Sequence, residues 1–348
     1  MKNKVREKQQ QKATASDVAE LVGVSKWTVL RAFKNGASIS PKVREQVLEA
    51  ANRLGFRPNL LARGLKQRKT NIIGVVTDEF NNPHTLKMLS EVSHQLNERG
   101  YMMLLLNTDS QENYRSVLEM AGQLQVDGLL FLATILSDEL ILTAESVHQV
   151  PSVHVCRNTD TPDVEVVNID GFAAGMEMGQ LLLDQGYQRF GYMEGRNTET
   201  THLLRMEGYQ SVLQAAGKKL DILLKCNHYD REIAYRAMSD YLRVTPAESR
   251  IDALFCENDV LAFGAMQAIR DYDADLHIGI VGFDDVEEAR TTTWNLTTWA
   301  QRSDLQIAEA LNRLLGSPAD EQGPWRYGEL RIRQSHLNPA ADPISEAK

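Results

Sequence analysis

Apolar runs of strand length alternate with segments of helical pattern from residue 71 to residue 338, and this alternation limits the possible folds more than any other feature. Strands made only of apolar residues are buried on both faces of a sheet, and the helices between the strands cover these faces. Because the alternation restarts after Asp170, we predict an α/β body of two doubly wound parallel-sheet lobes. The expected strands are IIGVVTD, YMMLLLNTD, DGLLFLAT, PSVHVC, VEVVNID, RFGYMEG, DILLKC, IDALFCEND and IGIVGFDD.

The helices and crossings of this body follow from the same pattern. We expect helices near residues 85–99, 113–125, 138–148, 172–185, 202–216, 231–243 and 260–272. We expect the chain to cross between the lobes near residue 170, near 291–299 and near 322–330. Two lobes joined by several strands suit a ligand cleft at the carboxyl ends of the strands.

The charge of the chain is divided unequally between its two parts. Residues 1–70 carry a formal charge of +11 and the remaining residues carry −20, within a total of −9. Such asymmetry indicates that the basic N-terminal part binds nucleic acid or a membrane. The basic start, residues 1–12, is expected to be a disordered arm that adds salt-sensitive attraction. No apolar run is long enough for a signal peptide or a membrane span, so we expect a cytoplasmic protein, nucleoid-associated when bound to DNA.

Residues 13–57 have the pattern of a small all-α domain. Thr14, with an acidic residue three positions later, begins a first helix. Gly23 permits a tight turn, and Ser25 caps a second helix over residues 26–33. A helix, a short glycine turn and a helix predict a helix-turn-helix, whose second helix enters the major groove of DNA.

Helical periodicity assigns an inner and an outer face to these helices. In the second helix Lys26, Trp27, Leu30 and Arg31 are expected outside, and Val29, Ala32 and Phe33 inside. A third helix is expected from the cap Ser40-Pro41 to Gly55, with Val43, Val47, Ala50, Ala51 and Leu54 inside. Two alternatives stay open: Trp27 as a core residue, and Arg31 as a phosphate contact instead of a guanine reader.

A series of short motifs in the first 80 residues resembles one known family. The segments DVAELVGVS, TV.R, IS.KVRE.V..A...LGFRPN, AR.L and TNIIGVV occur in the order and spacing of the lactose/galactose repressor (LacI/GalR) family. The resemblance implies a hinge helix and linker over residues 58–70, and a leucine wedged into a base step at Leu65. The DNA contacts that we predict are Ser25, Lys26, Trp27, Thr28, Arg31, Asn59, Arg63 and Leu65.

The body is similar to the effector domain of the same family, which is of the periplasmic-binding-protein-like (type I) class. The matching segments are LLRMEGY, CENDVLAFGAM and GFDD, and the domain would span residues 71–338. An arginine and a carboxylate at strand ends supply donors and acceptors for a polyhydroxylated ligand, and an aromatic ring stacks on its apolar side. The effector contacts that we predict are Asp78, His84, Arg157, Asp170, Arg205, Tyr229, Asn258 and Asp284, with Tyr229 as the stacking residue.

Some residues near the predicted effector site have a structural role as an alternative to ligand contact. Asp170 has a structural role at the lobe crossing as an equal alternative, and His84 has a surface position as its alternative. We expect Asp259 to cap a helix that starts at Val260. The expected effector is a sugar, a sugar acid or a sugar phosphate. If Arg157 and Arg205 both face the cleft, we expect an anion such as a sugar acid or a sugar phosphate.

The resemblance also implies partners. The expected assembly is a homodimer on a pseudo-palindromic operator of double-stranded DNA, controlled by the effector. The tail, residues 339–348, has no leucine heptads, so a tetramer built by a coiled coil is not expected. No GxGxxG or P-loop is present, and Cys156, Cys226 and Cys256 are too widely spaced for a zinc site, so neither cofactor nor metal is expected. The rival classes are a sugar-transport protein and an enzyme on the same two-lobed body.

Overall fold

The computed structural model describes residues 13–34, 36–58, 69–108, 114–132, 150–196 and 201–339. The chain divides into two compact units, Met1–Thr70 and Asn71–Lys348, here called the head and the body. Several sequence predictions lie outside the described residues: the arm of residues 1–12, most of the hinge, the helix near 138–148 and the tail from residue 340. Asn59, Arg63 and Leu65, three of the predicted DNA contacts, lie outside them too.

The head contains the three predicted helices, α2 (Ala15–Val22), α3 (Lys26–Ala32) and α4 (Pro41–Leu54). Each begins at its predicted cap: Thr14 forms a capping box, Ser25 accepts from the amide of Thr28, and Ser40 accepts from that of Val43. Gly55 ends α4 at φ 68°, a left-handed conformation that costs glycine little. Local capping chemistry therefore fixes the ends of these helices.

One face of each helix forms the core of the head. Val18, Val29 and Val47 are fully buried and belong to one apolar cluster. The prediction for Leu54 is wrong, because its side chain is 37% exposed. Gly55 turns the chain, and the buried Phe56 enters the apolar cluster in place of Leu54.

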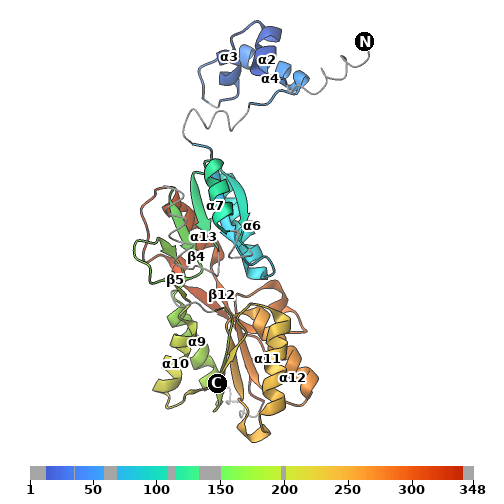
Figure 1. Cartoon of the computed structure of the whole chain (residues 1–348), viewed down its shortest axis with the longest axis vertical. Coiled ribbons are helices and arrows are strands. Elements are labelled where there is room, and N and C mark those ends of the chain that lie inside the picture. The colour runs from blue at the N-terminus through green and yellow to red at the C-terminus, as the bar shows by residue number, and fades with distance from the viewer. Residues whose placement is uncertain are drawn as a thin grey trace, which may run out of the picture. The chain divides into compact units, whose positions relative to one another are not determined.

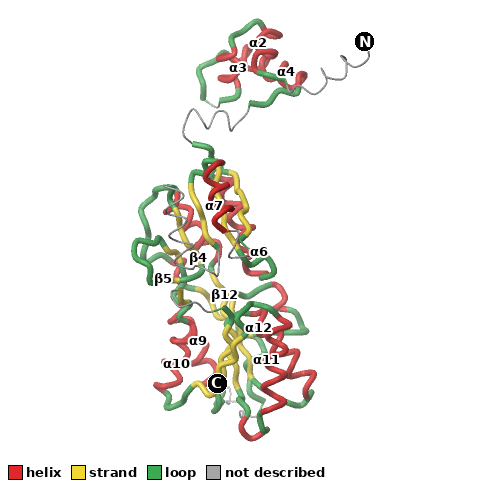
Figure 2. Tube along the Cα trace, viewed as in Figure 1, coloured by secondary structure: helices red, strands yellow, loops and turns green. Residues whose placement is uncertain are grey.

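The body consists of two α/β lobes, as predicted (Figure 1). Lobe 1 is built on a parallel sheet of order β2-β1-β3-β4-β6. Its elements in chain order are β1 (Ile72–Thr77), α6 (Pro83–Glu98), β2 (Met102–Asn107), α7 (Tyr114–Gln123), β3 (Gly128–Phe131), β4 (Ser152–Val155) and β6 (Val166–Val167). Figure 2 shows the yellow strands of both lobes flanked by red helices.

Lobe 2 is built on a sheet of order β13-β12-β11-β10-β7-β9. Its elements are α9 (Gly171–Asp184), β7 (Phe190–Glu194), α10 (Arg205–Ala215), β9 (Leu220–Lys225), α11 (Arg231–Val244), β10 (Ala253–Cys256), α12 (Asp259–Tyr272), β11 (Gly279–Phe283), β12 (Thr297–Gln301) and β13 (Gly328–Arg331). Short 3-10 helices span Ala247–Ser249, Glu287–Arg290 and Pro324–Arg326. The sheet departs from the prediction at one edge, because β13 runs antiparallel to β12.

A helix that the sequence analysis did not predict, α13 (Ser303–Leu314), ties the lobes together. It follows β12 of lobe 2, yet its buried Ile307 and Leu311 share an apolar cluster with Ile73 of lobe 1. In Figure 1 the red α13 lies beside β4 of lobe 1, and it packs against α6. The second crossing is therefore at residues 301–303 and not near 291–299. A further link is the two-stranded sheet of β5 (Asn158–Thr159) and β8 (Thr201–His202).

A buried histidine on β4 makes the core of lobe 1 sensitive to acid. His154 is 1% exposed, and its ring stacks on Phe131 with ring centres 4.4 Å apart. Burial lowers the pKa of His154 from 6.5 to about 4, because the imidazolium form loses its hydration. The unfolded chain therefore binds a proton more readily than the folded chain between these two pH values.

We predict that His154→Phe makes the unfolding free energy depend less on pH in the acid range. Relative to this variant, the wild type should lose about 3 kcal/mol of unfolding free energy as pH falls from 6.5 to about 4. Denaturant melts at several pH values measure the difference. Val153→Ala on the same strand is the control, since it creates a cavity without changing a titrating group. An equal pH slope in wild type and His154→Phe would contradict the prediction.

Candidate functional site

The outer face of α3 presents large side chains to solvent. Trp27 is 66% exposed and Leu30 49% exposed, whereas Val29 and Ala32 are buried. The alternative that Trp27 is a core residue is therefore wrong. The head thus presents an aromatic ring and cationic groups on the helix that was predicted to enter the major groove.

Among the predicted DNA contacts within the described residues, two already make bonds at the start of α3. The Ser25 hydroxyl accepts from the Thr28 amide at 3.1 Å and lies 2.9 Å from the Thr28 hydroxyl. Arg31 is held as well: its guanidinium lies 4.5 Å from the centre of the Trp27 ring, and its Nη2 donates to the carbonyl of Ser38. Lys26 is exposed at the first position of the helix.

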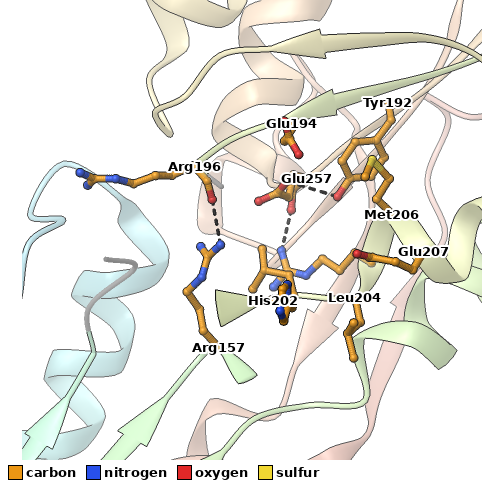
Figure 3. A pocket seen from close by; sticks show the side chains of 11 residues that line it. Arg157, Tyr192, Glu194, Arg196, His202, Leu204, Met206, Glu207 and Glu257 are labelled. Carbon is orange, nitrogen blue, oxygen red and sulfur yellow. Dashed lines mark hydrogen bonds between the residues drawn. The ribbon is translucent and has the colours of Figure 1, made fainter. Parts of the chain in front are cut away.

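In the body, a cavity of about 130 Å³ lies between the lobes at the ends of their strands. Arg157, two residues after β4 of lobe 1, lines it together with Arg205 and Glu257 of lobe 2. Figure 3 shows Arg157 and Glu257 pointing into the same space from opposite sides. Two of the predicted effector contacts, Arg157 and Arg205, are thus brought to one cavity, although 48 residues of sequence separate them.

Arg205 is the first residue of α10, and close helix packing sets its position. A Cβ on Gly175 of α9 would lie 2.0 Å from the carbonyl oxygen of Arg205, so only glycine allows this approach. The Arg205 guanidinium lies 3.5 Å from the centre of the Phe283 ring, and its Nη1 donates to the Glu257 carbonyl at 2.6 Å. Its Nε is buried and has no hydrogen-bond partner among the described residues.

Glu257 is a cleft residue that the predicted contacts did not include. Its carboxylate accepts from the hydroxyl of Tyr229, from the hydroxyl of Tyr192 at 3.4 Å and from the amide of Gly195 at 3.2 Å. Burial raises the pKa of this carboxyl above 4.5, although Tyr229, Arg205 and the amide of Gly195 act in the opposite direction. The available signal was its position directly after the apolar run ALFC, beside Asn258.

The structure gives Tyr229 a different contact from the predicted stacking. Its hydroxyl binds Glu257, and its ring lies against Gly195, where an added Cβ would be 2.1 Å from a ring carbon. Tyr229 does not line the cavity described above. Because its hydroxyl binds the carboxylate, Tyr229 holds Glu257 in place, and its stacking on an effector stays a prediction.

A second group of polar side chains bridges the lobes at His84. This residue follows the cap Asn82 of α6 and is 6% exposed, so the surface alternative is wrong. Its Nδ1 lies 3.8 Å from Asp284, and Gln301 donates to Asp284 at 2.7 Å and lies 3.3 Å from Nε2 of His84. Burial lowers the pKa of His84, so the neutral imidazole is favoured. Gln301, at the end of β12, was not predicted.

Asp78 forms a third bridge, again with a residue that was not predicted. Its carboxylate pairs with the guanidinium of Arg196 at 3.2 Å, and Nη2 of Arg157 donates to the carbonyl of Arg196 at 2.9 Å. Figure 3 shows the side chain of Arg196 extending away from the pocket while its carbonyl faces Arg157. Arg196 of lobe 2 therefore contacts lobe 1 through both its side chain and its backbone.

The two remaining predicted contacts are helix caps. Asn258 caps α12 by accepting from the amide of Leu261 at 3.0 Å, and its buried Nδ2 has no hydrogen-bond partner in the described part of the chain. The prediction that Asp259 is the cap is wrong, because Asp259 is already inside the helix. Asp170 caps α9 and lies 3.9 Å from Arg326, which is the structural role expected as its alternative.

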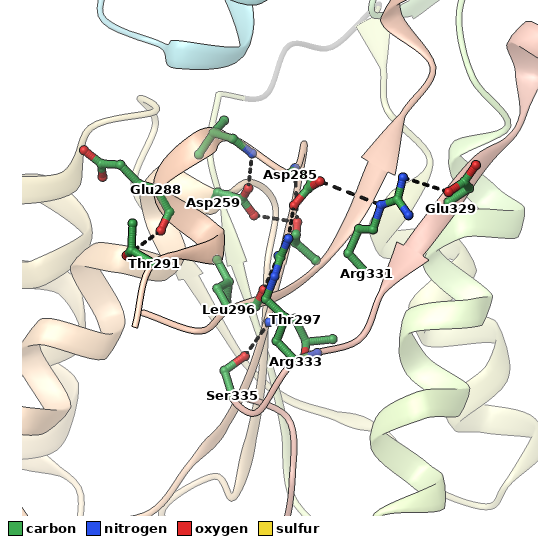
Figure 4. A network of polar contacts seen from close by, with 12 residues as sticks. Asp259, Asp285, Glu288, Thr291, Leu296, Thr297, Glu329, Arg331, Arg333 and Ser335 are labelled. Carbon is green, nitrogen blue, oxygen red and sulfur yellow. Dashed lines mark hydrogen bonds and ion pairs between the residues drawn. The ribbon is translucent and has the colours of Figure 1, made fainter. Parts of the chain in front are cut away.

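A polar network holds the loop that carries Asp284 (Figure 4). Asp284 has φ 108°, which is strained for a residue other than glycine. The amides of residues 284, 285 and 286 donate in turn to the carbonyl of Trp299, the hydroxyl of Thr298 and the carboxylate of Asp259. The pair of Asp285 with Arg333 at 2.6 Å anchors the same loop to the C-terminal segment. The network fixes a conformation that the backbone alone disfavours.

Within the described ranges, no group of three or more histidine, cysteine or acidic side chains is arranged to hold a metal ion. Among the same residues, no helix is both long enough and apolar enough to cross a membrane.

Two family models match the chain. "Bacterial regulatory proteins, lacI family" matches residues 14–59, and "Periplasmic binding proteins and sugar binding domain of LacI family" matches residues 70–313. The ribose operon repressor of Escherichia coli (strain K12) is 31% identical over 298 residues, covering 84% of this chain and 89% of the relative. The chain belongs to the LacI family of bacterial regulatory proteins. It is a DNA-binding transcriptional regulator with an effector domain of the sugar-binding type.

Other relatives of this LacI-family regulator are similar over almost its whole length. The transcriptional repressor PurR of Mannheimia succiniciproducens is 29% identical over 333 residues, covering 93% of this chain and 98% of the relative. The crystal structure of the lac repressor dimer bound to operator and the anti-inducer ONPF covers 94% of this chain and 100% of that chain, with a TM-score of 0.80. At 20% identity, this last likeness shows the fold alone. The curated relatives named here are transcriptional regulators and not enzymes.

We predict that the carboxyl of Glu257 makes stability depend on pH. The pKa of Glu257 is higher in the folded chain than its value of 4.5 in the unfolded chain. Its contribution to the unfolding free energy is therefore largest below pH 4.5 and is lost as pH rises through the pKa of the folded chain. The unfolding free energy of wild type relative to Glu257→Gln should therefore fall as pH rises. Denaturant melts between about pH 4 and pH 8 measure this difference. Met206→Leu in the same cavity is the control, and a difference that rises with pH would refute the assignment.

Proposed function

We propose that the protein is a homodimeric transcriptional repressor. Its two heads bind a pseudo-palindromic operator, and an effector between the lobes controls the affinity for DNA. The observation that carries the DNA-binding part is the outer face of α3, where Trp27, Leu30 and Lys26 are exposed on a head with a charge of +11. The relatives that are named as repressors support repression over activation.

The edge of the lobe 1 sheet supports the homodimer. β2 is an edge strand, and its Met102 and Leu105 are 60% and 41% exposed. Leu86 on α6 is 50% exposed. An apolar edge strand is a template for association unless it is covered, and a second copy of this chain would cover it. The lac repressor structure that shares the fold is itself described as a dimer bound to operator, and a two-fold dimer requires two half-sites.

The cleft favours an effector that carries a negative charge beside hydroxyl groups. Arg205 is 5% exposed, yet its one hydrogen bond goes to a neutral carbonyl and it has no ion pair with a described residue. A buried guanidinium is stabilised when a carboxylate or phosphate accepts from it. The buried Nδ2 of Asn258 and Nδ1 of His84 have no hydrogen-bond partner among the described residues, and acceptor oxygens of a ligand would satisfy them. We therefore favour a sugar acid or sugar phosphate over a neutral sugar.

Effector binding would change the DNA affinity through the angle between the lobes. The contacts of Arg196 with Asp78 and of His84 with Asp284 link the two lobes next to the cavity. A ligand that exchanges bonds with these groups changes the relative free energy of open and closed arrangements. In the dimer this changes the spacing of the hinge segments, and coupling of about 1–3 kcal/mol is typical of such linkage.

Binding, and not chemical conversion, is the role that the carboxylates support. The buried carboxylates of Glu257 and Asp259 accept several hydrogen bonds from protein groups, and Asp285 pairs with Arg333. None of these contacts is the pairing of a nucleophile with a general base. Carboxylates that fix the shape of a cleft are the simpler account.

The effector class has a direct test in thermal melting and titration calorimetry. D-Gluconate and D-glucose 6-phosphate should raise the melting temperature by binding the native state, and D-glucose and D-ribose should not. Arg205→Lys should weaken binding of the anion by about tenfold or more, because an ammonium cannot form the bidentate pair. Arg236→Lys on the exposed face of α11 is the matched control. Tight binding of the neutral sugars and none of the acids would end the anionic assignment.

DNA binding has an independent test with total genomic fragments in a gel-shift assay at moderate salt. The full chain should retain a subset of fragments, and the logarithm of affinity should fall with log salt at about 0.9 per phosphate contacted. Lys26→Glu on α3 should abolish this retention, whereas Lys219→Glu makes the same change of net charge in the body and should not. Absence of any sequence-preferred fragment would contradict the proposed function.

A further inference from the structure

The recognition helix carries an aromatic ring and an arginine that contact each other. Trp27 and Arg31 are four positions apart on α3, so their side chains lie on one face of the helix. The Arg31 guanidinium lies 4.5 Å from the centre of the Trp27 ring. A cation held over the face of tryptophan is attracted by the negative charge of the ring face.

A second contact restrains the same guanidinium. Its Nη2 donates to the carbonyl of Ser38, in the segment that leads to α4. The Arg31 Cζ lies over the Trp27 ring, and the N–H groups of a guanidinium lie in its own plane. Nη2 donates to Ser38, whereas Nη1 and Nε donate to no described residue. These two groups can donate to acceptors outside the protein.

The cost of exposing Trp27 argues that its ring has a use at the surface. It is 66% exposed, although tryptophan is usually highly buried and the other three tryptophans of the chain are at most 8% exposed. The core of the head is complete without it, since Val18, Val29 and Val47 are already fully buried. The contact with Arg31 is the one ring contact of Trp27 recorded within the described residues.

We infer that Trp27 is a positioning residue that fixes the Arg31 guanidinium for a guanine edge in the major groove, so that the two residues read one base pair as a unit. A free arginine side chain loses much rotamer entropy on binding, and a side chain already held loses less. Trp27 therefore raises the discrimination that Arg31 achieves. This inference rests on the proposed reading of DNA by α3.

The test separates this role from ordinary packing of Trp27 against DNA. The purified full chain is incubated with a random-sequence duplex library, and the bound fraction is sequenced. The variants are Trp27→Phe, Trp27→Leu, Arg31→Ala and the double variant Trp27→Leu/Arg31→Ala. Arg31→Ala should lower the preference at one G·C pair of each half-site about 5- to 100-fold. Trp27→Leu should lower the preference at that same pair about 2- to 5-fold.

The other variants decide the mechanism. Trp27→Phe keeps an aromatic face and should retain part of the preference, whereas leucine keeps apolar bulk without such a face. The double variant should match Arg31→Ala at that pair, because nothing is left to position. Leu21→Ala removes an exposed apolar side chain from α2 and is the matched control. Trp27 is a surface residue, so these variants should keep the far-UV spectrum of the wild type.

Three results would overturn the inference. If Trp27→Leu changes only a different base pair, Trp27 reads DNA independently. A second such result is that Trp27→Leu keeps the full preference at the base pair where Arg31→Ala loses it. In that case an apolar side chain without an aromatic ring is enough to position Arg31, and the aromatic face has no role. If the wild type selects no sequence at all, the proposed function fails together with the inference, and this outcome is distinct from the other two.

Discussion

The guanidinium of Arg205 organises the lobe 2 side of the cavity between the lobes. It lies on the Phe283 ring of β11 and binds the carbonyl of Glu257 after β10, so one side chain connects two neighbouring strand ends to the start of α10. Arg205 is buried, and its position depends on the close contact of Gly175 with the start of α10. If α10 packed on α9 one residue out of register, the guanidinium would move away from its present contacts. The shape of the cavity follows from this arrangement.

The bridges between the lobes next to the cavity are polar, and this suits a site that responds to a ligand. Apolar clusters fill each lobe, and α13 shares the cluster of lobe 1, whereas the bridges at Asp78 and His84 are single ion pairs or hydrogen bonds. Such bonds exchange with ligand groups at small net cost, while a packed apolar interface would resist any change of angle. Control by a small molecule is thus compatible with two rigid lobes.

Elements with strong local signals were predicted well from the sequence. The caps Ser25 and Ser40 and the terminating Gly55 placed the head helices to within about one residue. The nine predicted strands of the body followed from their apolar runs, whereas β12, β13 and the short β5 and β8 were not predicted. The helix α13 was missed because its buried face packs on lobe 1, far away in the chain, and the neighbouring β12 belongs to lobe 2. Asn258 and Asp259 were confused because either side chain can cap a helix, and only the position of Thr298 separates their roles.

Local chemistry within the chain was sufficient for the class of fold, the helix-turn-helix and the division of charge. The choice of Arg205 and Asp284 as cleft candidates also needed the resemblance to a known family. The contacts among them required the folded body, since Glu257, Gln301 and Arg196 acquire their partners only where strand ends from both lobes meet. The physical reason is distance along the chain: periodicity and capping act over a few residues, whereas a buried polar group finds its partner wherever the packing brings one.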